Sequence, residues 1–330
     1  MKQYQHAAGG HWSSVQCAGV LLLCRICTFF CAKHAYSAAY AKGMTVAVLL
    51  TAGLLLPLLH KAGQLTVPEG LLVLYRIYAL MQAARILAGI SVLLTDLDSP
   101  HPLMTMLLLF AALAALAGLP HAAAARAAAV MLFVMCAAFL LLPVSGIATA
   151  RTVWLYTPGD AGAAFLREFA EAGELGILPL LWMREQRPHA AAAWLIGRGT
   201  VLPLTVLFGA MQNGRLTQWT GNPFFLLLGR TPLSEAFRTD GLWLVLAVLC
   251  GVISLTVFVQ IAAEPRPLRC TADRREQYAV LIPLAALTVL WRITPVPAAV
   301  SGICAVLLGI GVPWCIAVAD MVRHRRTASA

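Results

Sequence analysis

Residues 160–183 read DAGAAFLREFAEAGELGILPLLWM, a helix-like stretch that carries charges in an otherwise apolar chain. From about residue 173 to 183 it is apolar apart from Glu174, but this part is shorter than the ~20 residues that a membrane-spanning helix needs. After Asp160 at its first position, its charged side chains are Arg167, Glu168, Glu171 and Glu174. Each costs at least ~2.5–3.5 kcal/mol when it faces lipid. The charged part therefore lies in the membrane interface or lines a protected cavity.

Two structures fit this pattern. The first is an amphipathic helix that lies on the membrane surface and buries Phe165, Leu166 and Phe169. The second is a discontinuous helix at a transporter-like binding site, with the carboxylates turned towards an enclosed pocket. The sequence leaves both open, and the second is the working hypothesis.

Under that hypothesis the charges divide between two roles. Arg167 and Glu171 are four residues apart and can pair on one helix face, which Glu174 shares. Glu168 lies one step round the helix. A carboxylate that Arg167 does not neutralise could bind a ligand or carry a proton. Two glycines and a proline near Glu174 permit a local break and a kink: Gly173, Gly176 and Pro179.

The composition of the whole chain also indicates a membrane protein. Of its 330 residues, 60% are hydrophobic and 12% are charged, and the mean hydropathy is +0.80. These values are typical of an all-α, polytopic membrane protein, and the segments lack the alternation of a membrane barrel. The formal charge of +10 sits in short loops beside apolar spans, which favours lipid headgroups over nucleic acid as the partner.

About ten apolar segments are long enough to be considered as spans. They are expected at 14–32, 43–59, 70–95, 103–119, 124–148, 161–183, 189–211, 240–263, 277–293 and 297–321. The connecting loops leave no room for a soluble domain, so residues 1–330 form one integral membrane domain. The densest basic clusters, 266–275 and 323–326, fall on the side of the N-terminus, which predicts that both termini are cytoplasmic.

Three further arginines fall deep inside expected spans: Arg25, Arg85 and Arg198. At that depth an arginine either pairs with a carboxylate or lines a cavity, and the sequence leaves both roles open. The chain has no metal-ligand spacing, nucleophile elbow or phosphate loop. We therefore expect no enzyme activity, no metal and no cofactor.

Several short motifs occur in a suggestive order. They are Trp12-Ser13-Ser14-Val15-Gln16 before the first span, Gly173-Glu174 followed by Pro179, Asn222-Pro223, Arg238-x-Asp240 with Trp243, and the basic tail 323–326. Together they resemble the endospore germination permeases, the B subunits of GerA-type nutrient germinant receptors. That family belongs to the amino acid–polyamine–organocation transporter superfamily.

The resemblance implies two inverted repeats of five spans each, with spans one and six broken near mid-membrane. It implies an amino acid site at the breaks, a spore inner membrane or cell membrane location, and two partner subunits, one membrane-embedded and one a lipoprotein. Arg238 and Asp240 are expected as gate or structural residues. The family usually has a glycine in mid-span one; here Leu23 to Cys27 contains none, and Arg25 either fills the site or pairs with a span-six glutamate.

Three functions remain open. In the first, a small nutrient such as an amino acid enters between spans one, three, six and eight and signals to partner subunits. In the second, the chain is a proton-coupled amino acid transporter with Glu174 as the proton carrier. In the third, it is a non-transporting scaffold whose buried charges only hold helices together. The polar stretch 212–238 is either an interfacial connector or a gate.

Overall fold

The computed structural model is all-helical wherever it describes the chain. It describes residues 12–31, 33, 36–59, 67–96, 102–147, 150–156, 158–185, 188–218, 222–224, 227, 239–263, 274–295 and 297–328. The α-helices are α2 (Ser14–Phe30), α3 (Ala38–Leu59), α4 (Glu69–Asp96), α5 (Pro102–Ala117), α6 (His121–Gly146), α7 (Ala161–Glu171), α8 (Leu178–Glu185), α9 (Pro188–Asn213), α12 (Thr239–Ala263), α13 (Arg274–Ile293), α14 (Ala298–Val306) and α15 (Val312–Ala328). Shorter turns are η2 (Thr152–Tyr156), η3 (Gly173–Ile177), η4 (Gly214–Gln218) and the π-helical η5 (Leu307–Gly311).

Seven helical stretches within the described residues are long and apolar enough to cross a membrane. They are Ala38–Leu58, Glu69–Thr95, Ala122–Pro143, His189–Asn213, Gly241–Ala263, Arg275–Ile293 and Ala299–Val322. Two shorter apolar helices, Ser14–Phe30 and Met106–Ala117, lie in the expected segments 14–32 and 103–119. The chain is therefore a multi-pass helical membrane protein.

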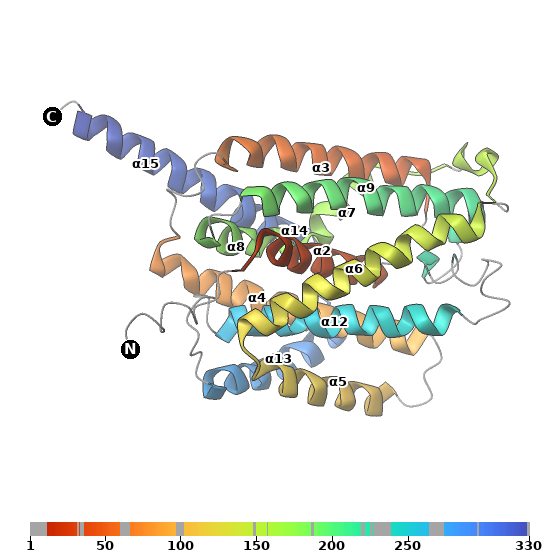
Figure 1. The fold of residues 1–330 in the computed structure, drawn as a ribbon, viewed down its shortest axis with the longest axis horizontal. Coiled ribbons are helices and arrows are strands. Elements are labelled where there is room, and N and C mark those ends of the chain that lie inside the picture. Colours follow the sequence, from red (N-terminus) through yellow and green to blue (C-terminus); the bar gives the residue numbers. More distant parts are fainter. Residues whose placement is uncertain are drawn as a thin grey trace.

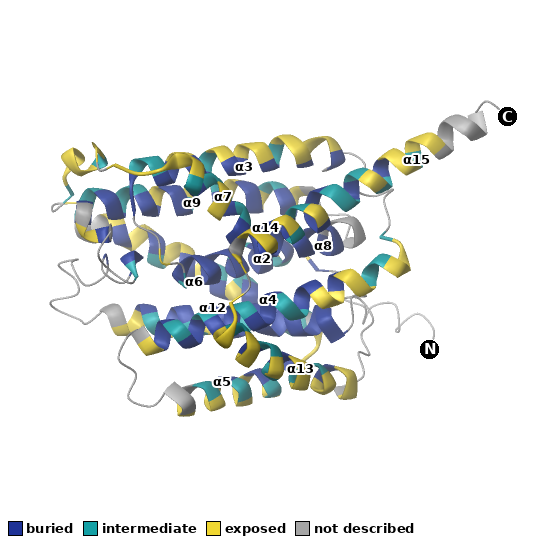
Figure 2. Cartoon of the chain, turned by 180° about the vertical axis from the view of Figure 1, so that it is seen from behind, coloured by how far each residue is buried: buried dark blue, intermediate teal, exposed yellow. Residues whose placement is uncertain are grey.

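The long helices lie side by side as a bundle (Figure 1). Helices α3 and α9 form one side, α5 and α13 the opposite side, and α2 lies between them. Large apolar side chains are exposed on the outward faces, for example Leu49 of α3, Leu107 of α5 and Ile282 of α13 (Figure 2). A surface of this kind is stable against lipid tails, which supports the membrane assignment.

Helix α2 runs through the centre of the bundle without a break. It begins with a capping box in which the Ser13 hydroxyl accepts from the Gln16 N–H, while the Gln16 side chain accepts from the Ser13 N–H. Most of its residues are buried against α6, α9 and α12. The expected break in span one is therefore wrong. No glycine or proline interrupts the middle of this helix, and Arg25 occupies the helical position where unwinding was expected.

The close contact of α3 with α7 depends on Gly43. A methyl group added there would overlap the carbonyl oxygen of Ala161 and come within 2.7 Å of the Ala164 Cβ atom. Because a backbone atom cannot move aside cheaply, we expect Gly43→Ala to lower the free energy of unfolding by about 1–3 kcal/mol. The measurement is denaturant unfolding of the purified protein in detergent.

Gly53→Ala is the matched control for this substitution. Gly53 lies on the same helix, and an added methyl group there would meet nothing within 4 Å. Since alanine also favours helix over glycine, this variant should be as stable as the parent or slightly more stable. Equal losses in the two variants would contradict the assigned contact of α3 with α7.

Candidate functional site

The stretch 160–183 is interrupted once, directly after Glu171. Helix α7 ends at Ala172, whose ψ of 55° is not helical. The 3₁₀ turn η3 follows, and α8 then continues towards the far end of the bundle. Irregular backbone at membrane depth is tolerated only where protein surrounds it, and every residue of η3 is buried.

Five charged side chains form an alternating chain beside this break: Glu171, Arg25, Glu168, Arg198 and Glu174. Glu168 is central, since its two carboxylate oxygens lie 2.5 Å from Arg25 Nη2 and 2.7 Å from Arg198 Nε. Glu171 Oε2 lies 3.3 Å from Arg25 Nη2, and Glu174 Oε1 lies 3.7 Å from Arg198 Nη1. All five residues are buried. The ion chain therefore joins α7 and η3 to α2 and α9.

Burial decides between the two interpretations of residues 160–183. Glu168 is 0% exposed, whereas Leu166 is 68% exposed. The charged face of α7 thus points into the protein and an apolar side chain points out, so the helix lying flat on the membrane is wrong. Arg167, the expected neutralising partner, is exposed, and Arg25 also stands next to Glu171. The sequence left two roles open for Arg25 and Arg198, which were pairing with a carboxylate and lining a cavity. The structure shows both arginines in ion pairs.

Glu174 is the least satisfied member of the ion chain. Neither of its carboxylate oxygens accepts a hydrogen bond from any described residue, and Arg198 Nη1, which lies nearest, donates none. The guanidinium of Arg198 lies over the Trp194 ring, 5.2 Å from its centroid. A buried carboxylate held this loosely is a weak point in the packing.

Helix α4 presents a polar stripe to the break in span six. The stripe comprises Tyr75, Tyr78, Gln82 and Arg85, which share one helix face. The Tyr78 hydroxyl donates to the carbonyl oxygen of Gly173 at 2.8 Å, and Arg85 Nη1 donates to that of Ala170. The stripe thus satisfies carbonyl groups that the end of α7 leaves without helical partners. Of these four residues, only Arg85 is predicted from the sequence as a site residue. Tyr75, Tyr78 and Gln82 have the spacing of one helix face, so the sequence could have identified them as well.

The same stripe reaches a second irregular turn in the last membrane segment. There η5 is a π-helical turn, and the Tyr75 hydroxyl donates to the Leu308 carbonyl oxygen at 2.8 Å. Gln82 Nε2 donates to Ser301 Oγ on α14 at 3.0 Å. The turns η3 and η5 also contact each other. Two breaks in helical geometry, from segments far apart in sequence, therefore meet at one face of α4.

Glycines at the break serve close packing. A methyl group on Gly173 would lie 2.5 Å from Gln82 Oε1, and one on Gly176 would overlap the Tyr78 ring. Neither has a positive φ; among the described glycines only Gly214 does. The expected break does occur here, because the backbone changes from α7 to the 3₁₀ turn η3 at Gly173. In addition, the Tyr78 ring leaves no room for a larger residue at Gly176.

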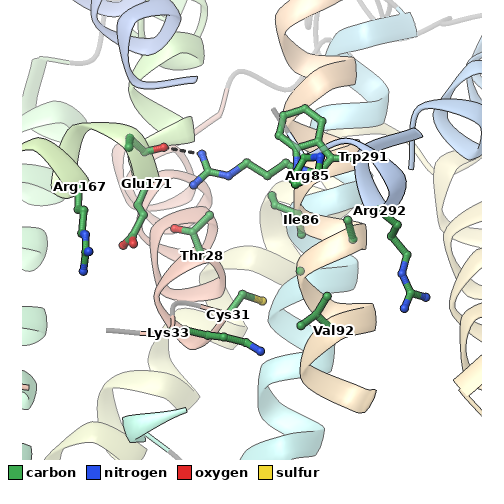
Figure 3. Close-up of a pocket in the computed structure, with 14 residues that line it drawn as sticks. Thr28, Cys31, Lys33, Arg85, Ile86, Val92, Arg167, Glu171, Trp291 and Arg292 are labelled. Carbon is green, nitrogen blue, oxygen red and sulfur yellow. Dashed lines mark hydrogen bonds between the residues drawn. The ribbon is translucent and has the colours of Figure 1, made fainter. Parts of the chain in front are cut away.

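A pocket of about 660 Å³ lies beside the break, lined by α2, α4, α7 and α13 (Figure 3). Its polar lining includes Thr28, Lys33, Arg85, Arg167, Glu171 and Arg292. Arg85 reaches from α4 towards α7, and Lys33 lies between the ends of α2 and α4 (Figure 3). Glu171 belongs both to the pocket wall and to the ion chain, so it connects the two.

Of the remaining predicted positions, Pro179 is not among the described residues that line the pocket. Pro179 lies in the first turn of α8, where a missing N–H is harmless. Arg238 lies outside the described residues, as does the Asp240 side chain, although Asp240 belongs to α12. The sequence hypothesis placed the nutrient between spans one, three, six and eight. In the structure α13, which corresponds to the expected ninth span 277–293, lines the pocket.

Comparison with known proteins adds no family assignment. The chain matches no protein-family model, no curated protein and no solved structure. The part of the chain that the structure describes contains no group of three or more His, Cys, Asp or Glu side chains that could hold a metal ion.

Proposed function

We propose that this chain is a permease-like membrane subunit that binds a small nutrient, in the manner that the resemblance to spore germination receptors implies. The pocket supports this proposal. It lies within the ~300–1,000 Å³ range of small-molecule sites. Its wall carries a carboxylate, Glu171, and a cation, Arg85. An amino acid carries the complementary ammonium and carboxylate groups.

The contact of Glu171 with Arg25 is the observation that carries the proposal. At 3.3 Å it is the looser of the two Arg25 ion pairs, because the pair with Glu168 is 2.5 Å long. A ligand ammonium that binds Glu171 competes with Arg25 for this carboxylate. The competition alters the ion pairing that joins α7 to α2, and a population shift between two bundle arrangements follows. Partner subunits would respond to that shift.

The proposal includes a topology and a cellular setting. Residues 1–330 would form about ten spans in two inverted repeats, with the interrupted segment α7–η3–α8 as span six and both termini in the cytoplasm. The chain would assemble with one membrane-embedded subunit and one lipoprotein in the spore inner membrane. Spores that lack this chain should then fail to germinate on at least one amino acid or sugar of a test panel, and germination on every nutrient would count against the receptor role.

Binding by the purified protein tests the site directly. We expect Glu171→Gln to weaken amino acid binding about 10- to 100-fold, because a charge-assisted hydrogen bond is lost while Arg25 keeps its pair with Glu168. Equilibrium binding of labelled amino acids to protein in lipid nanodiscs measures this. Glu276→Gln removes an exposed carboxylate of α13 and is the matched control. Equal affinities of the two variants would remove Glu171 from the site.

A proton-coupled amino acid transporter is the second proposal. The supporting observation is Glu174, a fully buried carboxylate that accepts no hydrogen bond from the described residues. If it carries a proton, vesicles containing the protein should accumulate labelled amino acid when a proton gradient is applied. Glu174→Gln should abolish that accumulation and leave binding intact. Binding without accumulation in the parent protein favours the sensor.

A further inference from the structure

The pocket carries an excess of positive charge. Its basic side chains are Lys33, Arg85, Arg167 and Arg292, and its carboxylate is Glu171. Over the described residues that line the pocket, four positive charges less one negative charge give a formal charge of +3. A neutral amino acid, whose own charges cancel, does not reduce this excess.

We propose that the preferred ligand of the pocket is an acidic amino acid, which has one ammonium and two carboxylate groups. This inference rests on the proposed function and specifies its substrate class. The ammonium matches the single carboxylate of Glu171, and the two carboxylates match the surrounding cations. Net charge therefore separates the favoured ligand from neutral amino acids of the same size.

The pocket has a fixed inner wall and a charged mouth. Arg85 is held at the inner wall, because its Nη1 donates to the Ala170 carbonyl oxygen and to Ser301 Oγ. With Glu171 it forms a site for the α-ammonium and α-carboxylate groups. Lys33, which follows α2, and Arg292 of α13 are both exposed, so they define the mouth. A second carboxylate on a short side chain reaches that mouth.

Electrostatic strength differs between these two regions. Charges interact more strongly where protein excludes water, so the inner pair contributes most of the affinity for any amino acid. The mouth residues are partly screened by solvent, and their attraction for the second carboxylate weakens as salt increases. Selectivity for an acidic side chain should therefore depend on salt more steeply than binding of a neutral one.

The experiment compares three probes with the full-length protein in phosphatidylcholine nanodiscs. L-Glutamate carries all three groups, L-glutamine lacks the second charge, and glutarate lacks the ammonium. We expect L-glutamate to bind at least about 10-fold more tightly than either of the others, which corresponds to about 1.4 kcal/mol. Raising the salt concentration should reduce the preference for L-glutamate over L-glutamine.

Variants at the mouth test which residues set the ratio. Lys33→Gln and Arg292→Gln should each reduce the preference for L-glutamate over L-glutamine about 3- to 10-fold, with little change in L-glutamine affinity. Arg126→Gln is the control, because Arg126 is exposed on α6, which does not line the pocket. A preference that survives both mouth substitutions overturns the assignment.

The remaining outcomes distinguish the inference from the proposed function. If L-glutamine binds as tightly as L-glutamate, or if glutarate does, the acidic amino acid assignment is wrong while a small-molecule site remains. If no amino acid binds, the proposed function itself fails. Phosphatidylserine headgroups carry one ammonium, one carboxylate and one phosphate, and therefore the same signs of charge as L-glutamate. A large loss of L-glutamate affinity in phosphatidylserine discs would assign the pocket to lipid and overturn the inference. Unchanged affinity in those discs supports a free amino acid.

Discussion

Glu168→Gln is expected to lower the free energy of unfolding by about 3–5 kcal/mol, the largest loss among the substitutions considered. Glu168 pairs with Arg25 at 2.5 Å and with Arg198 at 2.7 Å, and all three side chains are fully buried. The neutral amide keeps the size of the side chain but leaves two buried guanidinium groups without their central counter-charge. Denaturant unfolding in detergent, followed by tryptophan fluorescence, measures the loss.

Two further variants make this result interpretable. Glu276→Gln changes an exposed carboxylate on α13 and should alter stability by no more than about 0.5 kcal/mol. The double variant Glu168→Gln with Arg198→Gln removes one buried cation together with the carboxylate, so its loss should be smaller than the sum of the single losses by about 1–3 kcal/mol. Strict additivity would mean that this pair does not act as a unit.

Gly309→Ala is expected to have the second largest effect. Gly309 lies in the π-helical turn η5, and an added methyl group would overlap the carbonyl oxygen of Leu175 in η3 and come within 2.7 Å of the Leu175 Cγ atom. The obstruction includes backbone, so the two turns must separate. We expect a loss of about 3 kcal/mol in the free energy of unfolding, at the upper end for added volume in a packed core.

The same substitution should disturb function. Separation of η5 from η3 moves the backbone next to Glu174 and Arg198, so amino acid binding should weaken more than stability alone explains when measured at a temperature where the variant is folded. Gly311→Ala, in the same turn, places a methyl group 3.8 Å from the nearest atom, a Leu307 methyl carbon, and is the control. Equal behaviour of the two variants would show that the contact between the turns is unimportant.

Residues 160–183 show which features of the site can be predicted from a sequence pattern and which cannot. The pattern correctly predicted buried carboxylates, because charges in an apolar segment must avoid lipid. It placed Arg167, Glu171 and Glu174 on one face by counting along a continuous helix. That counting fails beyond Ala172, where the backbone leaves the helix and the angular relation between residues changes.

The glycine argument had a similar limit. In span one, the absence of a glycine between Leu23 and Cys27 was visible, and the helix is indeed continuous there. Near Glu174 the expected break occurs at Gly173, where η3 begins. The close packing of Gly173 and Gly176 against Gln82 and Tyr78 was not predicted. The propensity of a segment to form or leave a helix can be predicted from its residues. The distance between two helices cannot, because it depends on which helices pack together.

The sequence by itself determined that this chain is an all-helical membrane protein and that the carboxylates of residues 160–183 avoid lipid, either in the membrane interface or in an enclosed site. Both follow from the cost of exposing charge or unpaired backbone to lipid, which acts on each segment separately. Tertiary structure alone decided that Arg25 and Arg198, 143 and 30 positions from Glu168, share its carboxylate. It also decided that α4 satisfies the carbonyl groups of both irregular turns and that α13 completes the pocket. Such partners depend on how helices far apart in the sequence pack together. The periodicity of a single helix carries no information about that packing.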